Sequence, residues 1–193
     1  MASQSRGAMR IKHVGELGED SIHMIRGLES LGAEIQISDG MISVSAKSGT
    51  FPCAPEKCID IGNSGTGCRF MLALASSMGS VSEITGDISL RSRPFEVITG
   101  ALADLGCSVS RTEGGGLVVS GPAVPGKVAL DLSKGSQPLS SLLIAAPSMG
   151  VNIEVEIQGE PVSQRYLELT YAICKLTGSE NEFSGHNIRI APW

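Results

Sequence analysis

The sequence predicts an α/β (α+β) fold built from copies of one βαβαββ unit. An apolar stretch ending in Ser-Met-Gly occurs twice, at 70–79 and 139–150, about 70 residues apart. Each copy is followed by a strand-like run that closes on a glycine, at 81–86 and 151–159. An amphipathic stretch ending at a second glycine then follows in both copies. Recurrence in this order is typical of a fold made from repeated supersecondary units.

The N-terminal region predicts a partial first copy that lacks the first half of the unit. The elements expected there are, in order, a disordered or tail-like segment over 1–9, a strand over 10–15, a helix over 21–31, and hairpin strands over 33–38 and 41–46. Asp39-Gly40 is a typical hairpin turn between the last two. We therefore expect one domain over 10–193, with a partial first repeat at 10–50, a second at 51–120 and a third at 121–193.

Two kinds of helix are expected within the units. Residues 70–78 and 139–149 are apolar or small nearly all the way round, which predicts helices buried on every side. Residues 95–105 and 166–176, like 21–31, mix polar and apolar positions as half-exposed helices do. Each complete unit should therefore place one helix centrally and one outside, with strands forming the wall.

Composition limits the possible functions. A chain of 193 residues can bury a real core as one domain. The net charge of −5 disfavours nucleic acid as the main partner, and an aromatic content of 4% argues against a base-stacking surface. Without an apolar run long enough for a bilayer or a signal-peptide pattern, we expect a soluble cytoplasmic protein that does not act at a membrane.

The five cysteines predict neither a disulfide framework nor a metal site. Their number is odd and they are scattered through apolar surroundings. Cys53 and Cys58 form the nearest pair, but no second pair accompanies them. Unreactive thiols in a reducing compartment are the expectation.

A polar, glycine-containing turn precedes each of the two buried helices, at 62–69 and 133–138. Free backbone N–H groups and the helix dipole favour a phosphate or carboxylate there, and glycine lets a ligand approach the backbone. Simple helix capping by Ser, Thr or Asn is the alternative. Neither turn matches a Walker A loop or a dinucleotide fingerprint, so ATP and NAD are not expected.

Arginines follow the second strand of the unit in both copies. Arg91 and Arg93 lie in the loop over 86–94, and the corresponding loop of the third unit carries Ser163 and Arg165. Guanidinium groups in such loops can hold an oxyanion through paired donors. A solvated, charged loop is the alternative reading of either segment alone.

Four motifs together resemble one family, the 5-enolpyruvylshikimate-3-phosphate synthases (3-phosphoshikimate 1-carboxyvinyltransferases). They are Gly62-Asn63-Ser64-Gly65-Thr66-x-x-Arg69, Gly86-Asp87-x-Ser89-Leu90-x-x-Arg93-Pro94, Ser136-Gln137 and Ser163-x-x-Tyr166. The resemblance implies an enolpyruvyl transferase-like domain, with its units around a pseudo-threefold axis and its buried helices parallel. It also implies that the chain covers most of one of two domains, without the family's opening Gly-Ser-Lys-Ser-type segment.

The resemblance assigns site residues by position. Those similar to the phosphoenolpyruvate side are Asn63, Gly65 and Arg93, with Thr66 beside them; those similar to the shikimate 3-phosphate side are Gly135, Ser136, Gln137, Ser163 and Tyr166. Arg69 resembles an arginine that braces the helix start. Two positions depart from the family pattern. Gly135 stands where a serine is common and offers only its N–H, and Pro138 replaces a residue that is usually aromatic or apolar.

The implied reaction transfers an enolpyruvyl group from phosphoenolpyruvate to shikimate 3-phosphate and releases phosphate, in aromatic amino-acid biosynthesis. The resemblance implies no metal or organic cofactor, and we assign no proton-transfer residue in this chain. A complementary second domain or chain is an expected partner, and we expect weak or no activity without it.

Two alternatives stay open from the sequence. The UDP-N-acetylglucosamine enolpyruvyl transferases share the fold, but their usual reactive cysteine is absent from 86–94, where Ile88 stands at about its place. The other alternative is a non-catalytic half-protein that binds a phosphorylated ligand or a partner.

Overall fold

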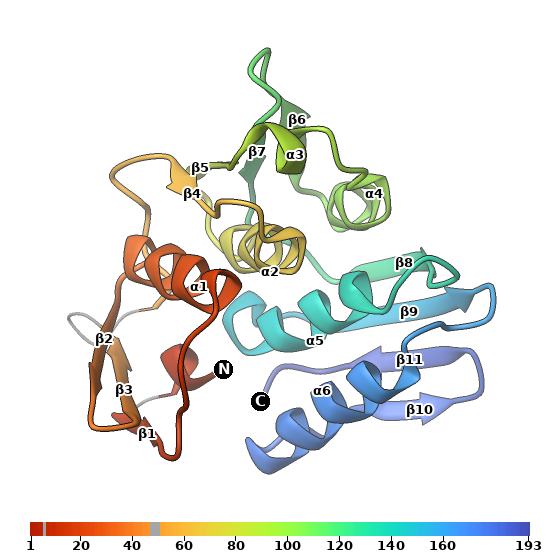
Figure 1. Cartoon of the computed structure of the whole chain (residues 1–193). Coiled ribbons are helices and arrows are strands. Elements are labelled where there is room, and N and C mark those ends of the chain that lie inside the picture. The colour runs from red at the N-terminus through yellow and green to blue at the C-terminus, as the bar shows by residue number, and fades with distance from the viewer. Residues whose placement is uncertain (6, 47–50) are drawn as a thin grey trace.

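The structure is a computed structural model that describes residues 1–5, 7–46 and 51–193. It arranges three units around a common centre, each with its sheet on the outside (Figure 1). Helices α2 (Gly65–Ala75) and α5 (Gln137–Met149) occupy that centre and pack against each other. The predicted boundary between the first and second repeats, near residue 50, lies outside the described residues.

Elements follow one order along the chain. The first unit comprises the 3-10 helix η1 (Ala2–Gln4), β1 (Met9–Ile11), α1 (Glu19–Ser30), β2 (Ala33–Ser38) and β3 (Met41–Ala46). The second comprises β4 (Ile59–Asp60), α2, β5 (Val81–Thr85), the short α3 (Ile88–Arg91), α4 (Glu96–Asp104), β6 (Ser108–Arg111) and β7 (Leu117–Ser120). The third comprises β8 (Gly126–Asp131), α5, β9 (Ile153–Gln158), α6 (Gln164–Leu176), β10 (Glu182–Ser184) and β11 (Asn187–Ile190).

Sheet topology confirms the α/β fold of repeated units. The second and third sheets have equivalent strand orders, β4-β5-β7-β6 and β8-β9-β11-β10. Within each, the first pair is parallel and the other pairs are antiparallel. The first sheet, β1-β3-β2, repeats this order with three strands in the described residues, so β1 corresponds to β5 and β9.

The two central helices form the core of the molecule. Met71, Leu72 and Leu74 of α2 and Leu142 and Leu143 of α5 are almost completely removed from solvent. Both helices are buried nearly all round, as their composition predicts. Burial raises the pKa of the Cys68 thiol in α2 to about 12, so this cysteine is a neutral core residue.

Helix α2 begins at Gly65, five residues before the predicted start at Phe70. The glycines of the preceding motif favoured a loop because glycine is a poor helix former. Tertiary packing overrides that preference here. Gly65 and Gly67 are buried, and a Cβ at Gly65 would lie 2.6 Å from Nη1 of the distant Arg93.

The expectation of a tail over residues 1–9 is wrong for its first residues and for its end. Residues 2–4 form η1, in which the Ser3 side chain is buried. The Gln4 side chain donates to the Ile144 carbonyl at 2.8 Å and accepts from the Ser148 hydroxyl at 2.6 Å. These bonds to α5, which hydropathy could not reveal, hold the segment in place. Strand β1 then starts at Met9 and is shorter than predicted.

Among the described residues, no helix combines the length and the apolar character needed to cross a bilayer.

Candidate functional site

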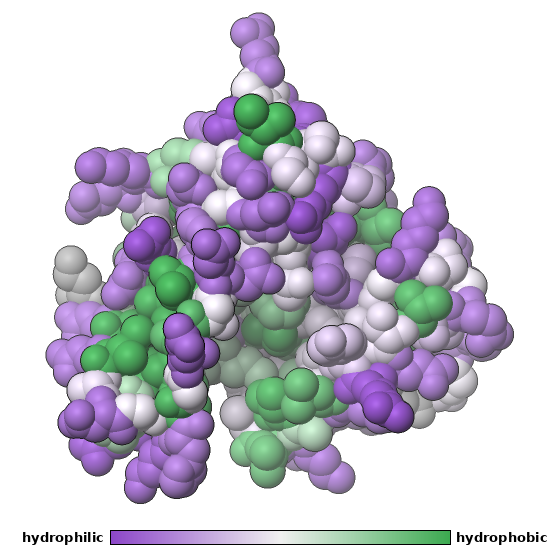
Figure 2. Space-filling model, viewed as in Figure 1, coloured by the Kyte–Doolittle hydropathy of each residue, from purple (hydrophilic) through white to green (hydrophobic). Residues whose placement is uncertain are grey.

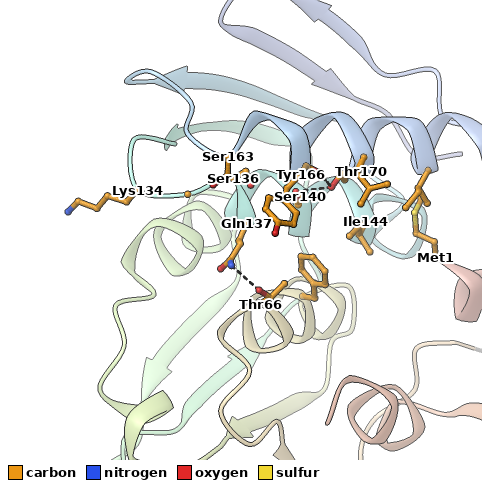
Figure 3. Close-up of a pocket in the computed structure, with 14 residues that line it drawn as sticks. Met1, Thr66, Lys134, Ser136, Gln137, Ser140, Ile144, Ser163, Tyr166 and Thr170 are labelled. Carbon is orange, nitrogen blue, oxygen red and sulfur yellow. Dashed lines mark hydrogen bonds between the residues drawn. The ribbon is translucent and has the colours of Figure 1, made fainter. Parts of the chain in front are cut away.

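The first turns of α2, α5 and α6 meet around one open cavity of about 560 Å³ (Figure 3). Six of the predicted binding residues line it: Thr66, Gly135, Ser136, Gln137, Ser163 and Tyr166. The remaining three, Asn63, Gly65 and Arg93, do not line it. The structure thus divides the predicted residues into two neighbouring clusters.

Gln137 at the start of α5 connects the two clusters. Its amide nitrogen donates to the Thr66 hydroxyl at 2.8 Å, and its amide oxygen accepts from the Arg69 guanidinium at 2.9 Å. The side chain is therefore held between the two central helices, with its donor toward the cavity and its acceptor toward the arginine. This pair of bonds also fixes the orientation of the amide.

Two serine hydroxyls at the cavity have no hydrogen-bond partner in the described part of the chain. Ser136 precedes α5 and is 3% exposed, yet its side chain makes no capping bond. Ser163 precedes α6 and also makes none. Its backbone has φ +60°, an uncommon conformation for a residue other than glycine. Hydroxyls held beside a cavity with their donors unused can bind an anionic oxygen.

Asn63, Gly65 and Arg93 form the second cluster at the start of α2. The Arg93 guanidinium donates to the Asn63 side-chain oxygen. It lies directly over Gly65, where an added Cβ would be 2.6 Å from Arg93 Nη1. Only glycine therefore lets the guanidinium approach the helix start this closely without a shift.

Arg69 joins this cluster to the cavity. Its guanidinium donates to the carbonyls of Gly65 at 3.0 Å and Pro94 at 2.9 Å, besides its bond to Gln137. It also lies over the Phe95 ring, 4.7 Å from the ring centre. Burial, together with the nearby Arg93 charge, lowers the pKa of Arg69, but a guanidinium remains protonated at any ordinary pH. The side chain thus ties the start of α2 to the end of the 86–94 loop.

The turn over 62–69 is tightly packed against the following loop. The Gly62 carbonyl accepts from the Asp87 N–H at 3.0 Å, and a Cβ at Gly86 would lie 2.1 Å from that carbonyl oxygen. The Asp87 carboxylate accepts from the Leu90 N–H at 2.7 Å and caps α3. The loop over 86–94 is therefore structured by the turn that it contacts, which a solvated loop would not be.

Two basic residues near the clusters were not assigned by sequence reasoning. Lys134 lines the cavity, although in Figure 3 its side chain extends away from the other labelled residues. Its position beside Gly135 could have suggested it. Arg111 donates to the carbonyls of Arg91 at 2.6 Å and Arg93 at 3.2 Å. It comes from β6, so no local sequence signal links it to the site.

Positive charge gathers here although the chain is acidic as a whole. Within the described residues, the single ion pair is between Lys127 and Glu156, at 3.4 Å on the surface. Arg69 and Arg93 are bonded to neutral oxygens and form no ion pair within the described residues, although the nearby Glu96 carboxylate acts to raise the pKa of Arg69. Guanidinium groups that form no ion pair, beside unused hydroxyl donors, suit a ligand that carries negative charge. The described residues hold no group of three or more His, Cys, Asp or Glu placed to bind a metal ion.

Comparisons with known proteins agree with this geometry. The family model for EPSP synthase (3-phosphoshikimate 1-carboxyvinyltransferase) matches residues 1–192. A 3-phosphoshikimate 1-carboxyvinyltransferase of Methanoculleus marisnigri is 36% identical, over 84% of this chain and 39% of its own length. One of Methanococcoides burtonii is 35% identical, over 88% of this chain and 40% of its own length.

Solved structures resemble the fold. An EPSP synthase from Acinetobacter baumannii matches with a TM-score of 0.80 and 23% identity, over 99% of this chain and 43% of that one. The enolpyruvyl transferase NikO from Streptomyces tendae matches with a TM-score of 0.67 and 13% identity, over 100% of this chain and 44% of that one.

The fold is therefore that of the enolpyruvyl transferases. Within that class, the chain belongs to the EPSP synthase family, as the sequence resemblance predicted. It spans about 40% of the length of the curated relatives that it matches.

Proposed function

We propose that this chain supplies part of a site that binds shikimate 3-phosphate and phosphoenolpyruvate for enolpyruvyl transfer. One observation carries the proposal: the unbonded Ser136 and Ser163 hydroxyls face one cavity with the Gln137 amide. In this proposal the phosphate of shikimate 3-phosphate accepts from these groups, while Gly135, Tyr166 and Thr66 border the ligand.

The second cluster is the proposed binding region for phosphoenolpyruvate. Arg93 carries a charge that no carboxylate of the described residues neutralises, and Gly65 leaves room beside it. Gln137 contacts both Thr66 and Arg69, so its side chain lies between the two proposed binding regions. Two adjacent anion sites would hold the two negatively charged substrates next to each other. In water these substrates repel each other.

The proposed reaction proceeds by addition and elimination. A proton adds to the methylene carbon of phosphoenolpyruvate, and the 5-hydroxyl of shikimate 3-phosphate attacks the adjacent carbon. The resulting tetrahedral intermediate loses phosphate and a proton to give the enolpyruvyl ether. The residues of this chain bind and orient the two substrates. No proton-transfer role is assigned to them, and we expect the isolated chain to release little phosphate because its cavity is open to solvent.

The experiment is an NMR titration of the purified chain with shikimate 3-phosphate, with shikimate as the ligand that lacks the phosphate. We expect saturable shifts at Ser136, Gln137 and Ser163 with the phosphorylated ligand and much smaller ones with shikimate. A double variant, Ser136→Ala with Ser163→Ala, should weaken binding at least tenfold, because each hydroxyl bond to a charged oxygen contributes about 1.5–3 kcal/mol. Ser110→Ala, an exposed serine on β6, is the matched control.

Absence of shifts at millimolar shikimate 3-phosphate would contradict the proposal, as would equal shifts with shikimate. A UDP-N-acetylglucosamine substrate is less favoured, because the family match is to EPSP synthase and Ile88 of α3 offers no thiol. Binding of shikimate 3-phosphate without any effect of added phosphoenolpyruvate would favour the non-catalytic alternative.

A further inference from the structure

Arg111, the last residue of β6, uses its guanidinium to hold three backbone carbonyls. Nη1 donates to the Arg91 carbonyl at 2.6 Å and to the Gly115 carbonyl at 3.2 Å, and Nη2 donates to the Arg93 carbonyl at 3.2 Å. Within the described residues the side chain forms no ion pair. It therefore joins the β6–β7 hairpin to the end of the 86–94 loop, which lies beside the hairpin in Figure 1.

The hairpin that carries Arg111 is fixed by bonds of its own. The Thr112 N–H donates to the Gly116 carbonyl at 2.9 Å, and the Gly116 N–H donates to the Thr112 hydroxyl at 3.0 Å. Gly115, between them, has φ +81°, and a Cβ there would lie 2.9 Å from the Arg91 Cβ. The turn of the hairpin thus packs directly on the loop and gives Arg111 a firm support.

The end of the loop has little apolar packing of its own. Residues 91–94 are exposed or half-buried, and Figure 2 shows a mostly hydrophilic surface around the projecting tip of the hairpin. Two side chains from other elements hold this stretch through its backbone. Arg111 bonds to the Arg93 carbonyl, and Arg69 bonds to the Pro94 carbonyl at 2.9 Å. Polar contacts therefore fix the main chain here.

A displacement of Arg93 would be felt at the candidate site. Its guanidinium donates to the Asn63 side-chain oxygen. It also passes so close to Gly65 that a Cβ there would lie 2.6 Å from Nη1. This narrow space leaves the side chain little freedom, so the position of its backbone decides where the positive charge lies.

Arginine suits such a role for two reasons. Its planar fork presents N–H groups in fixed directions, whereas the lysine ammonium is a point charge on a flexible stem. Its charge also adds to the field at the start of α2. Burial raises the pKa of the Cys68 thiol to about 12, and the charges of three arginines oppose that rise. These are Arg69, Arg111 and Arg93.

We propose that Arg111 is a positioning residue for the second cluster, Asn63, Gly65 and Arg93. It holds the main chain of the loop so that the Arg93 guanidinium stays over Gly65, and it adds positive charge nearby without contacting the ligand. The identity of that ligand, phosphoenolpyruvate, rests on the proposed function, whereas the positioning of Arg93 does not.

The positioning is tested first without ligand. Arg111→Met removes the three bonds and keeps a long side chain, and Arg111→Lys keeps the charge but not the fork. In both variants we expect at least tenfold faster exchange of the Arg93 amide, which donates to the Leu90 carbonyl at 3.0 Å. The Asp87 amide at the start of the loop, bonded to the Gly62 carbonyl, should change less than twofold. A general loss of stability would accelerate both amides.

NMR titration with phosphoenolpyruvate, at saturating shikimate 3-phosphate, then measures the effect on binding. Arg111→Met should weaken phosphoenolpyruvate about tenfold, because a misplaced Arg93 loses a charge-assisted bond, and Arg111→Lys should not restore the affinity. Both variants should bind shikimate 3-phosphate within twofold of the unaltered chain. Arg189→Met, which replaces an exposed arginine of β11, is the matched control and should change neither the exchange nor the affinities.

Several outcomes would overturn the proposal. One is an unchanged exchange rate of the Arg93 amide in both Arg111 variants. Another is faster exchange with an unchanged affinity for phosphoenolpyruvate, since Arg93 would then not need to be held. A third is an Arg111→Lys variant that matches the unaltered chain in both measurements, because charge alone would then explain Arg111. Faster exchange at Arg93, in a chain that binds no phosphoenolpyruvate even when unaltered, would support the positioning and contradict the proposed function.

Discussion

The turns before α2 and α5 occupy corresponding places in the second and third units, but they are organised differently. In the second unit, Ser64 accepts from the Gly67 N–H at 3.1 Å, and Asn63 accepts from Arg93. In the third unit, neither Ser136 nor Ser163 makes a side-chain cap bond. One turn satisfies its polar groups internally and presents charge, whereas the other keeps hydroxyl donors unused beside a cavity.

The sequence left helix capping and anion binding as alternatives for both turns. The hydrogen bonds in the structure distinguish between them. Ser64 is a capping residue, and its hydroxyl is committed to the helix. Ser136 occupies the same position relative to α5 without that commitment. The second turn should therefore matter more for stability and the third more for ligand binding.

The largest effect is expected at the glycines that end the second strand of each unit. Gly86→Ala would place a Cβ 2.1 Å from the Gly62 backbone oxygen, which cannot move without opening the turn. We expect a loss of about 3 kcal/mol or more in the free energy of unfolding. Gly159→Ala meets only the side chains of Asp131 and Ser133 within 3.2 Å, but its φ of +68° disfavours alanine by about 1–2 kcal/mol.

Urea denaturation of both variants measures the difference. Equal losses for Gly86→Ala and Gly159→Ala would show that the close approach of Gly86 to the Gly62 oxygen costs no more than the positive φ at Gly159. The second-unit turn would then be no more tightly built than the third.

A smaller effect is expected at Arg69, which ties the second-unit turn to Gln137. Arg69→Ala removes three hydrogen bonds and the contact with Phe95, so we expect a loss of about 2–3 kcal/mol in the free energy of unfolding. Arg165→Ala is the control, because Arg165 is exposed. It should change stability by less than about 0.5 kcal/mol. An Arg69→Ala variant as stable as the control would mean that the guanidinium does not brace the turn.

Much of this fold could be predicted because its elements recur in the same order along the sequence. The buried helices and the strands over 33–38 and 41–46 follow from local patterns, and the structure confirms them. The start of α2 at Gly65 did not follow, since the packing that favours glycine there comes from distant residues. The position of η1 also depends on a bond between Gln4 and Ile144, which are far apart in sequence.

The sequence predicted several residues of the candidate site, but not the hydrogen bonds that connect them. The motifs located Thr66, Gln137 and Ser163, and the structure brings all three to one cavity. The bond from Gln137 to Arg69, and the distinction between Ser64 and Ser136, require coordinates. Arg111 gave no signal, because it contacts the 86–94 loop only through backbone carbonyls.

The smallest changes in stability are expected at Ser64 and Ser136, and these two residues test the comparison of the turns most directly. Ser64→Ala removes a cap bond and should lower the free energy of unfolding by about 1 kcal/mol. Ser136→Ala removes no cap bond, so its stability should stay within about 0.5 kcal/mol of the unaltered chain. Thermal or urea denaturation under identical conditions would measure both.

For ligand affinity, the larger loss is expected for Ser136→Ala, whereas for stability it is expected for Ser64→Ala. Ser136→Ala is expected to weaken shikimate 3-phosphate about tenfold, since a hydrogen bond to a charged oxygen contributes about 1.5–3 kcal/mol. Ser64→Ala should change that affinity little, because the Ser64 hydroxyl already bonds to Gly67. If Ser64→Ala instead weakens the ligand as much as Ser136→Ala does, the two turns contribute equally to binding. The difference in hydrogen bonding between the second-unit turn and the third-unit turn would then not account for their roles in stability and ligand binding.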